Sequence, residues 1–354
     1  MKITKLTQNN YKDFDFGKFQ NSFWQSGIWI NIILSGGQAE SVFVLELDSK
    51  YAVAEKRKIT FGFGLFVLGV SDENIALFRE DLIKLSKEDN CLFVQFETIN
   101  YEGYKTQENF QKGSIGAEKD INSSEPYNSY GEGISRFGSS KTSFSKVSYY
   151  KKFITPYTAL IDLTKTEEEI LAQMKPKGRY NIKVAEKNEI VVKNAEITDE
   201  NISVFYDLMM ETTSRDSFNG NSLEFYKRFL NASDNNLLFI AYKGEVPVAA
   251  GIFVYFGELA TYYYGASSSD KAYRNLMSPY LLQWNAIKEG KFRGCKLYDF
   301  LGIASPNEEN SPLAGVTDFK LKLTPDSREV SHCEIYINNK IKYNLILLLK
   351  KLKK

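Results

Sequence analysis

The fold is decided by the stretch LLFIAYKGEVPVAAGIFVYF, residues 237–256, and by ELATYYYGAS, residues 258–267, which follows it. Their β-branched and aromatic side chains predict strands, and Lys243-Gly244 marks the turn of a hairpin. The next segment predicts a helix, and KLYDFLGI, residues 296–303, predicts another strand. A hairpin, a strand, a helix and a strand in this order indicate a mixed α/β lobe.

The same order of elements occurs earlier in the chain. Three strands are predicted within residues 41–68, and CLFVQFET, residues 91–98, predicts a fourth. Between them, residues 72–89 carry apolar side chains at steps of three and four, which is typical of an amphipathic helix with Ser71 or Asp72 as its N-cap. The repetition predicts two related lobes side by side.

The second lobe carries further predicted helices, one at its C-terminal end and four in front, at residues 166–174, 177–188, 199–215 and 222–232. The C-terminal segment, residues 338–354, is apolar and ends in lysines. Cations suit a helix C-terminus, so one interpretation is a terminal helix docked on the protein. The other is weak attraction to an anionic membrane surface or to RNA.

Residues 103–150 differ from the rest of the chain. Ten serines and six glycines fall among these 48 residues, and they show almost no aliphatic pattern, so we expect a flexible insertion outside the core. It is either a plain connector or an arm that contacts substrate through its lysines and tyrosines. We therefore divide the chain into a first lobe (1–102), this insertion (103–150) and a second lobe (151–354).

Composition excludes several classes of site. His332 is the only histidine in the chain, so a multi-histidine metal site is impossible, and its alternating segment indicates a structural strand residue. The three cysteines are far apart and form no CxxC pair, which argues against zinc and for a reducing compartment. We expect no metal and no cofactor. The sequence begins without an apolar leader and has no run of 18 apolar residues, so we expect a soluble cytoplasmic protein.

Several segments follow one another in an informative order. They are residues 155–188, TTSRDSF (212–218), YYYGAS (262–267), PYLLQWNAIKEGKFRGCKLYDFLGI (279–303) and GVTDFKLKL (315–323), with FWQSGIW (23–29) in the first lobe. Together they resemble the Fem (FemABX) family of peptidoglycan aminoacyltransferases. The resemblance implies two acetyltransferase-like lobes, each a mixed sheet flanked by helices. It also implies that the protein transfers an amino acid from aminoacyl-tRNA to an amino group of a UDP- or lipid-linked muropeptide. No histidine or covalent intermediate is needed for such a transfer.

The resemblance also implies roles for particular residues. Phe319 and Lys320 match a Phe-Lys pair beside the tRNA terminus, where Lys320 would stabilise negative charge in catalysis and Phe319 would stack on a base. Arg215 matches an arginine that binds the anionic acceptor. Asp299 matches a strand-end aspartate, and Trp29 closes the QSxxW motif of the first lobe; both are expected to help bind the substrate.

Periodicity adds two expectations. The tyrosines 262–264 alternate along a strand, so Tyr262 and Tyr264 share one face, with Tyr264 placed for catalysis and Tyr262 for substrate binding. The segment DFKLKL also alternates, so it predicts an edge strand with Lys320 and Lys322 exposed on one face.

The first lobe departs from the family pattern. Ile33 stands where the family has a lysine that helps to bind acceptor phosphates, so the acceptor differs or the cations of residues 56–58 replace that lysine. Two rival functions stay open. One is a CoA-dependent N-acyltransferase, disfavoured because AYRNLMSPYLL lacks glycine and Pro279 lacks an amide. The other is a non-catalytic protein that binds nucleic acid or a cell-wall precursor. The second interpretation of the C-terminal segment implies a peripheral membrane association, and the sequence makes no prediction of the oligomeric state.

Overall fold

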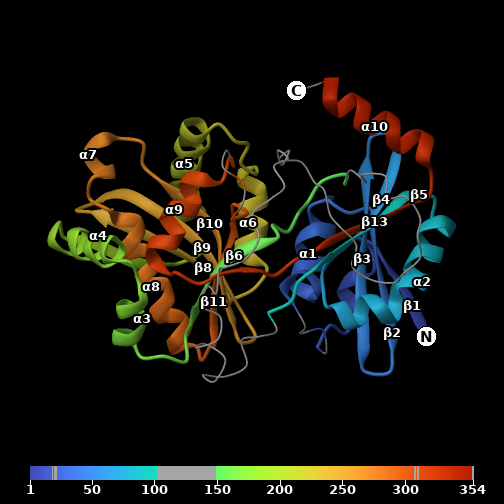
Figure 1. Ribbon diagram of the computed structural model, residues 1–354, viewed down its shortest axis with the longest axis horizontal. Helices are drawn as coiled ribbons and strands as arrows, with labels where there is room; N and C mark the ends of the chain where they lie inside the picture. The colour runs from blue at the N-terminus through green and yellow to red at the C-terminus, as the bar shows by residue number, and fades with distance from the viewer. Residues whose placement is uncertain (18, 20–21, 102–148, 307, 309–310, 353–354) are drawn as a thin grey trace, which may run out of the picture.

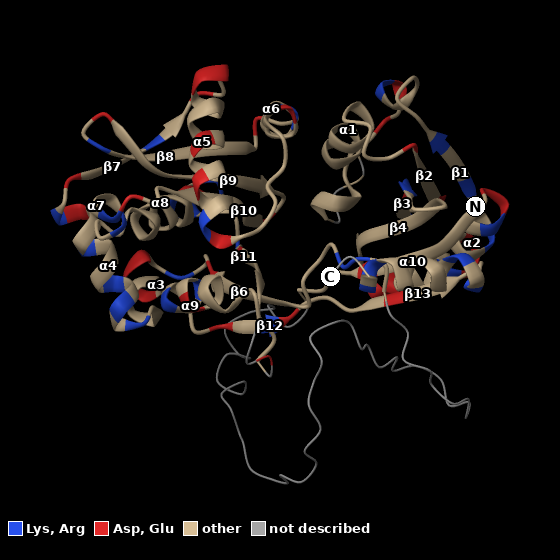
Figure 2. Ribbon diagram, turned by 90° about the horizontal axis from the view of Figure 1, so that it is seen from above, with Lys and Arg blue, Asp and Glu red and all other residues tan. Residues whose placement is uncertain are grey.

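The computed structural model describes residues 1–17, 19, 22–101, 149–306, 308 and 311–352. Two lobes lie side by side, each built on its own sheet (Figure 1 and Figure 2). The insertion expected at residues 103–150 falls outside the described residues except for its last two. Among the described residues, no helix has the length and apolar character that crossing a bilayer requires.

The first sheet has the strand order β1-β2-β3-β4-β5-β13. Its strands are β1 (Lys2–Leu6), β2 (Ser41–Leu47), β3 (Lys50–Ile59), β4 (Gly62–Val70), β5 (Cys91–Thr98) and β13 (Cys333–Ile337). The expected amphipathic helix is α2 (Asp72–Glu88), which Ser71 caps by accepting a hydrogen bond from Asn74. It covers one face of the sheet. The other face is covered by η1 (Tyr11–Asp13), η2 (Phe23–Gln25) and α1 (Gly27–Ser35).

The second sheet has the order β12-β6-β11-β10-β9-β8-β7. Its strands are β6 (Tyr157–Asp162), β7 (Ile190–Ala195), β8 (Asn236–Lys243), β9 (Val246–Phe256), β10 (Leu259–Ser267), β11 (Leu297–Ile303) and β12 (Ser327–Glu329). One core packs this sheet against α3 (Glu167–Gln173), α4 (Pro176–Lys187), α8 (Ser278–Phe292) and α9 (Ala314–Leu323). The short α7 (Lys271–Arg274) precedes α8.

The core between the lobes is continuous. The face of the second sheet that carries α5 (Asp199–Asp216) and α6 (Leu223–Asn231) shares one hydrophobic cluster with α1 and η2 of the first lobe. Phe23 lies in this cluster, with its ring centroid 5.8 Å from that of Phe229 and 5.5 Å from that of Tyr263. The two lobes are therefore held together by apolar packing as well as by the chain.

The expectation of two mixed α/β lobes with a repeated order of elements is confirmed. β8 and β9 form the predicted hairpin, with Gly244 in the left-handed region at φ 59°. The C-terminal part of the chain differs from the expectation, because β13 pairs antiparallel with β5 of the first sheet. The helix α10 (Lys340–Leu352) follows and buries Tyr343 and Ile346 on that lobe. The chain thus returns to the first lobe, which a count of consecutive elements cannot reveal.

Two local expectations were wrong. DFKLKL belongs to the helix α9 and forms no strand. The alternation of apolar residues predicted the wrong element, because contacts of this segment with α4 and β11 favour a helix. In β10 a bulge falls between Tyr262 and Tyr264, which makes Tyr263 the extra residue. Tyr263 and Tyr264 consequently pack into the core shared by the lobes, whereas Tyr262 packs into the opposite core.

Candidate active site

The parallel strands β10 and β11 separate in the middle of the second sheet. Their pairing runs from Leu259–Leu297 to Thr261–Asp299. Beyond this point each strand has a bulge, and Leu301 adopts a left-handed conformation at φ 55°. Parallel strands that separate at their carboxyl ends leave a wedge into which side chains and ligands fit.

Lys320 fills the inner part of this wedge. Its Nζ donates hydrogen bonds to the carbonyl oxygens of Leu301 at 3.2 Å and Gly302 at 2.7 Å, and lies 5.9 Å from the ring centroid of Tyr262. Only 6% of Lys320 is exposed, so the expectation of an exposed lysine was wrong. Burial lowers the pKa of Lys320 to about 8, against the opposing charge of Asp299.

The helix α9 is held close to α4, and this contact fixes Lys320. The carbonyl oxygen of Lys322 accepts a hydrogen bond from the backbone of Lys175 at 3.1 Å. A side chain at Gly178 would overlap that same oxygen, so glycine permits the close approach. Phe319 packs its ring 4.9 Å from that of Tyr280, which places it on the α8 side of the helix.

Asp299 is a buried carboxylate at the end of the paired region. It is fully buried, and it accepts hydrogen bonds from the Tyr101 hydroxyl at 2.5 Å, from the backbone of Leu301 at 2.7 Å and from the Thr158 hydroxyl. Burial raises the pKa of Asp299, although these donors favour its ionised form. Because Tyr101 follows β5, this carboxylate also connects the two lobes.

A cavity of about 100 Å³ opens beside Asp299 between the lobes. Its lining residues come from both lobes and from the connection before β6: Trp24, Ile99, Phe153, Ile154, Thr155, Thr158, Tyr263, Asp299, Leu301, Gly302 and Val330. The Trp24 indole donates a hydrogen bond to the Tyr263 hydroxyl at 3.1 Å. The hydroxyl accepts that bond and so keeps its own proton to donate, and burial raises the pKa of Tyr263 well above its usual value.

Tyr263 and Trp24 were missed as site residues. The sequence places Tyr263 on the face opposite its neighbours, and the bulge that reverses this has no signal in YYYGAS. Tyr264 does not line the cavity; its hydroxyl accepts a hydrogen bond from the Asn221 amide at 3.3 Å. Tyr262 and Lys320 are not among the lining residues, although Lys320 bonds to the carbonyl oxygens of Leu301 and Gly302, which are.

A buried carboxylate, Glu97 on β5, holds the connection that forms one wall of the cavity. It accepts hydrogen bonds from the backbone of Phe153 at 2.7 Å and Ile154 at 2.6 Å, and from the Gln95 amide at 2.7 Å. Burial raises the pKa of Glu97 to about 7. The position of Phe153 thus depends on a carboxyl group that is fully buried in the first lobe.

Trp29 belongs to a second polar chain in the first lobe. Its indole donates to Glu55 at 2.5 Å, and Glu55 also accepts from the Arg57 Nε at 2.7 Å. The Arg57 guanidinium lies 4.8 Å from the ring centroid of Phe153. Trp29 is only 8% exposed, and the polar partner of its indole is Glu55.

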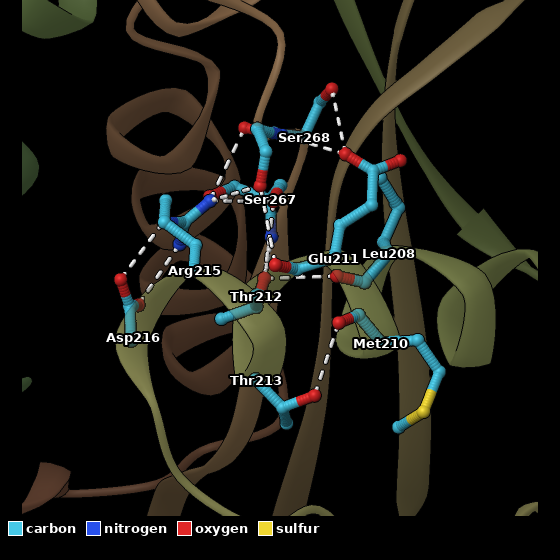
Figure 3. A network of polar contacts seen from close by, with 10 residues as sticks. Leu208, Met210, Glu211, Thr212, Thr213, Arg215, Asp216, Ser267 and Ser268 are labelled. Atoms are coloured by element: carbon cyan, nitrogen blue, oxygen red, sulfur yellow. Dashed lines mark hydrogen bonds and ion pairs between the residues drawn. The ribbon is translucent and has the colours of Figure 1, made fainter.

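Arg215 anchors the end of β10 (Figure 3). Its Nη1 donates to the carbonyl oxygen of Ser267 at 3.1 Å, while Nε and Nη2 contact both carboxylate oxygens of Asp216 at 2.9 and 3.0 Å. Glu211, one turn earlier, accepts from the backbone of Ser269 at 2.7 Å. Arg215 is not among the residues that line the cavity.

The described residues hold no group of three His, Cys, Asp or Glu side chains that could bind a metal ion. The buried polar groups of the site are instead satisfied by one another. Its chemistry is that of a phenol, carboxylates and a buried amine.

A model of the FemAB family matches residues 6–242 and 238–351, nearly the whole chain. The chain belongs to the FemAB family. Over 110 residues it is 36% identical to the aminoacyltransferase FemA of Staphylococcus epidermidis, a match that covers 31% of this chain and 26% of FemA. The chain thus matches only about a quarter of the length of that relative.

Solved structures share the fold. The structure of FemX superposes with a TM-score of 0.69 at 15% identity, over 98% of this chain and 100% of FemX. A C-terminal domain assigned to a lysylphosphatidylglycerol synthetase from Agrobacterium fabrum gives a TM-score of 0.56 at 12% identity, over 96% and 94% of the two chains. At these identities the likeness concerns the fold alone.

The structure shows where Ile33 and the neighbouring cations of the first lobe lie. Ile33 is 1% exposed and packs in the core shared by the lobes. Of the nearby cations, Lys56 pairs with Asp89 at 2.5 Å and Glu40 at 3.2 Å. Arg57 alternates with Lys56 along β3, so it lies on the opposite face, against Phe153 of the cavity wall.

Proposed function

We propose that this FemAB protein is an aminoacyltransferase, which moves an amino acid from aminoacyl-tRNA to an amino group of a peptidoglycan precursor stem peptide. The observation that carries the proposal is the family match along nearly the whole chain. The cavity supports it, because it lies where β10 and β11 separate and is lined by groups suited to polar chemistry.

The reaction requires correct positioning of the two substrates more than it requires a strong acid or base. The acceptor amine attacks the ester carbonyl carbon of the donor, forming a C–N bond and a transient oxyanion. The ester C–O bond then breaks, and the ribose hydroxyl leaves with the proton that the amine gives up. Holding the two reactants in line and stabilising the oxyanion supply most of the acceleration in such transfers.

We assign the oxyanion donor to Tyr263. Tyr263 lines the cavity, and its hydroxyl accepts from Trp24 and keeps its proton because burial raises its pKa. Asp299, the carboxylate on the same cavity, suits the incoming amine, because it can accept a hydrogen bond from the amine N–H. We assign Lys320 a positioning role, which its hydrogen bonds to the carbonyl oxygens of Leu301 and Gly302 support.

The acceptor is a UDP- or lipid-linked muropeptide, both of which carry phosphates. Arg57 is the first-lobe cation beside the cavity wall, so we assign the role of the absent lysine at Ile33 to Arg57. We assign a second anion contact to Arg215, with the acceptor replacing Asp216 as its partner.

A CoA thioester fits this chain less well as donor. Cradling a pyrophosphate requires free amides at a helix N-terminus. The helix α8 begins with Pro279 in its first turn, after Met277 in a left-handed conformation at φ 58°. The first turn therefore lacks one amide where CoA phosphates would lie.

The test is a single-turnover assay with purified protein, charged tRNA pools and both UDP-linked and lipid-linked muropeptides. We expect an amide product from aminoacyl-tRNA and none from acyl-CoA. Transfer from acyl-CoA would favour the N-acyltransferase alternative. Binding of either substrate without product would favour a non-catalytic protein.

Two neighbouring tyrosines provide a matched pair for the mechanism. Tyr263→Phe removes the cavity hydroxyl and should lower turnover by roughly a hundredfold, the scale of one lost oxyanion donor. Tyr264→Phe removes a hydroxyl outside the cavity and should leave turnover within about twofold. Equal effects of the two substitutions would contradict the assignment of Tyr263.

A further inference from the structure

The helix α10 carries an apolar stripe that faces away from the protein. The exposed fractions are 84% for Ile341, 43% for Leu345, 53% for Leu348 and 74% for Leu352. At steps of four, three and four residues these side chains lie along one side of the helix. Monomeric proteins seldom expose so many aligned aliphatic side chains without a use.

The opposite side of α10 is fixed to the first lobe. Tyr343 and Ile346 are each 1% exposed and pack into the shared core. Lys350 lies 3.6 Å from the ring centroid of Tyr150 and also donates to its carbonyl oxygen. Burial lowers the pKa of Lys350. These contacts fix the orientation of the helix, so the apolar stripe on its opposite side faces outward.

Lysines flank the stripe on both sides. At about 100° per residue, Lys342 lies on one flank and Lys340 and Lys351 lie on the other, and all three are exposed. The helix contains no aspartate or glutamate.

We propose that this face of α10 docks onto an anionic lipid bilayer. An apolar stripe bordered by lysines suits such a surface, since the aliphatic side chains enter the acyl boundary while the ammonium groups meet the phosphates. The inference goes beyond the transfer reaction and does not depend on it. Docking would hold the protein at the surface where a lipid-linked acceptor lies.

The test is sedimentation of the full chain with vesicles of phosphatidylcholine alone or mixed with phosphatidylglycerol. We expect binding to the anionic vesicles at low salt, little binding to phosphatidylcholine, and loss of binding at high salt because the phosphate contacts are screened. Light scattering of the same samples without vesicles measures self-association.

Two paired variants separate the contributions. Ile341→Ser with Leu348→Ser should weaken partitioning by roughly tenfold or more, as should Lys342→Gln with Lys351→Gln. The control is Phe292→Ser, which removes an apolar side chain that is 87% exposed at the end of α8. It should bind as the wild type does. Thermal melts should show little change, because these side chains are exposed.

Three outcomes would overturn the proposal. They are the absence of binding to anionic vesicles at low salt, equal binding by the wild type and both paired variants, and equal loss in the Phe292→Ser control. A concentration-dependent dimer that Ile341→Ser with Leu348→Ser abolishes, without vesicle binding, would assign the stripe to a second copy of the chain.

Discussion

The two lobes contain the same parallel pair of strands and use it differently. In the first lobe, β4 and β5 stay paired from Phe63–Cys91 to Val70–Thr98, nearly their full lengths. In the second lobe, the pairing of β10 and β11 ends at Thr261–Asp299. Lys320 and the cavity lie beside the opened end. One topology thus yields a closed scaffold and an open site, because β4 and β5 keep pairing across two irregularities whereas β10 and β11 separate beside Lys320.

The largest expected effect comes from removing the group that fills the opening. Lys320→Met keeps the bulk of the stem but leaves the carbonyl groups of Leu301 and Gly302 without their donor. We expect turnover to fall by roughly a hundredfold, because the strand beside the cavity loses its position. The free energy of unfolding should fall by about 1–3 kcal/mol, the cost of unsatisfied buried groups. Single-turnover transfer and denaturant titration measure the two effects.

The control for Lys320 is Lys322→Ala on the same helix. Lys322 pairs with Asp318 near the surface. Its substitution should change neither the free energy of unfolding nor the activation free energy of transfer by more than about 0.5 kcal/mol. Lys320→Arg should restore only part of the turnover, because a forked guanidinium places its donors differently. Wild-type turnover by Lys320→Met would remove Lys320 from the site.

The next effect tests the support behind the opening without touching it. In Gly178→Ala the new methyl group would overlap the Lys322 carbonyl oxygen and push α9 away from α4. We expect a loss of stability of about 3 kcal/mol and a fall in turnover as Lys320 moves. Gly315→Ala, on α9 with no atom near the added methyl, should be neutral or slightly stabilising. Equal melting temperatures of the Gly178→Ala and Gly315→Ala variants would show that α9 tolerates displacement.

The parallel pair β4 and β5, which stays closed, gives a prediction about the pH dependence of stability. Glu97 on β5 has its pKa raised from 4.5 to about 7 by burial, so folding takes up a proton between these values. Stability of the wild type should therefore fall as the pH rises from about 4.5 to 7, by about 3 kcal/mol relative to Glu97→Gln. Lys152 and the Gln95 amide oppose the shift. Denaturant titrations of the wild type and of Glu97→Gln across this pH range measure the effect. If Glu97 stays ionised, the difference in their free energies of unfolding will not change with pH.

The order of elements was predictable because it depends on local patterns. Hairpin turns, the Ser71 cap and the spacing of apolar residues in α2 all act within a few residues. The departures arise from contacts between distant segments. Lys320 looked exposed because alternation in DFKLKL fits a strand, whereas burial against β11 selects a helix. The bulge at Tyr263 and the return of β13 to the first sheet depend on packing across the whole chain.

The smallest expected effect concerns the far end of the opened strand, where Arg215 has two kinds of partner. Its bond to the Ser267 carbonyl holds β10 to α5, and its contact with Asp216 occupies the rest of the guanidinium. Arg215→Gln loses both and should cost about 1 kcal/mol of stability. If an acceptor phosphate replaces Asp216, the same variant should raise the acceptor KM several-fold with kcat little changed.

Asp216→Asn distinguishes an anion site from an anchor. The pair is half-exposed on the Asp216 side, so losing it should change stability by less than about 0.5 kcal/mol. The freed guanidinium should bind an anionic acceptor more readily and lower its KM by about twofold. Opposite shifts of KM in Arg215→Gln and Asp216→Asn cannot arise from anchoring alone, because both substitutions weaken the same contact. An unchanged KM in both variants, with stability reduced only in Arg215→Gln, would limit Arg215 to holding the strand.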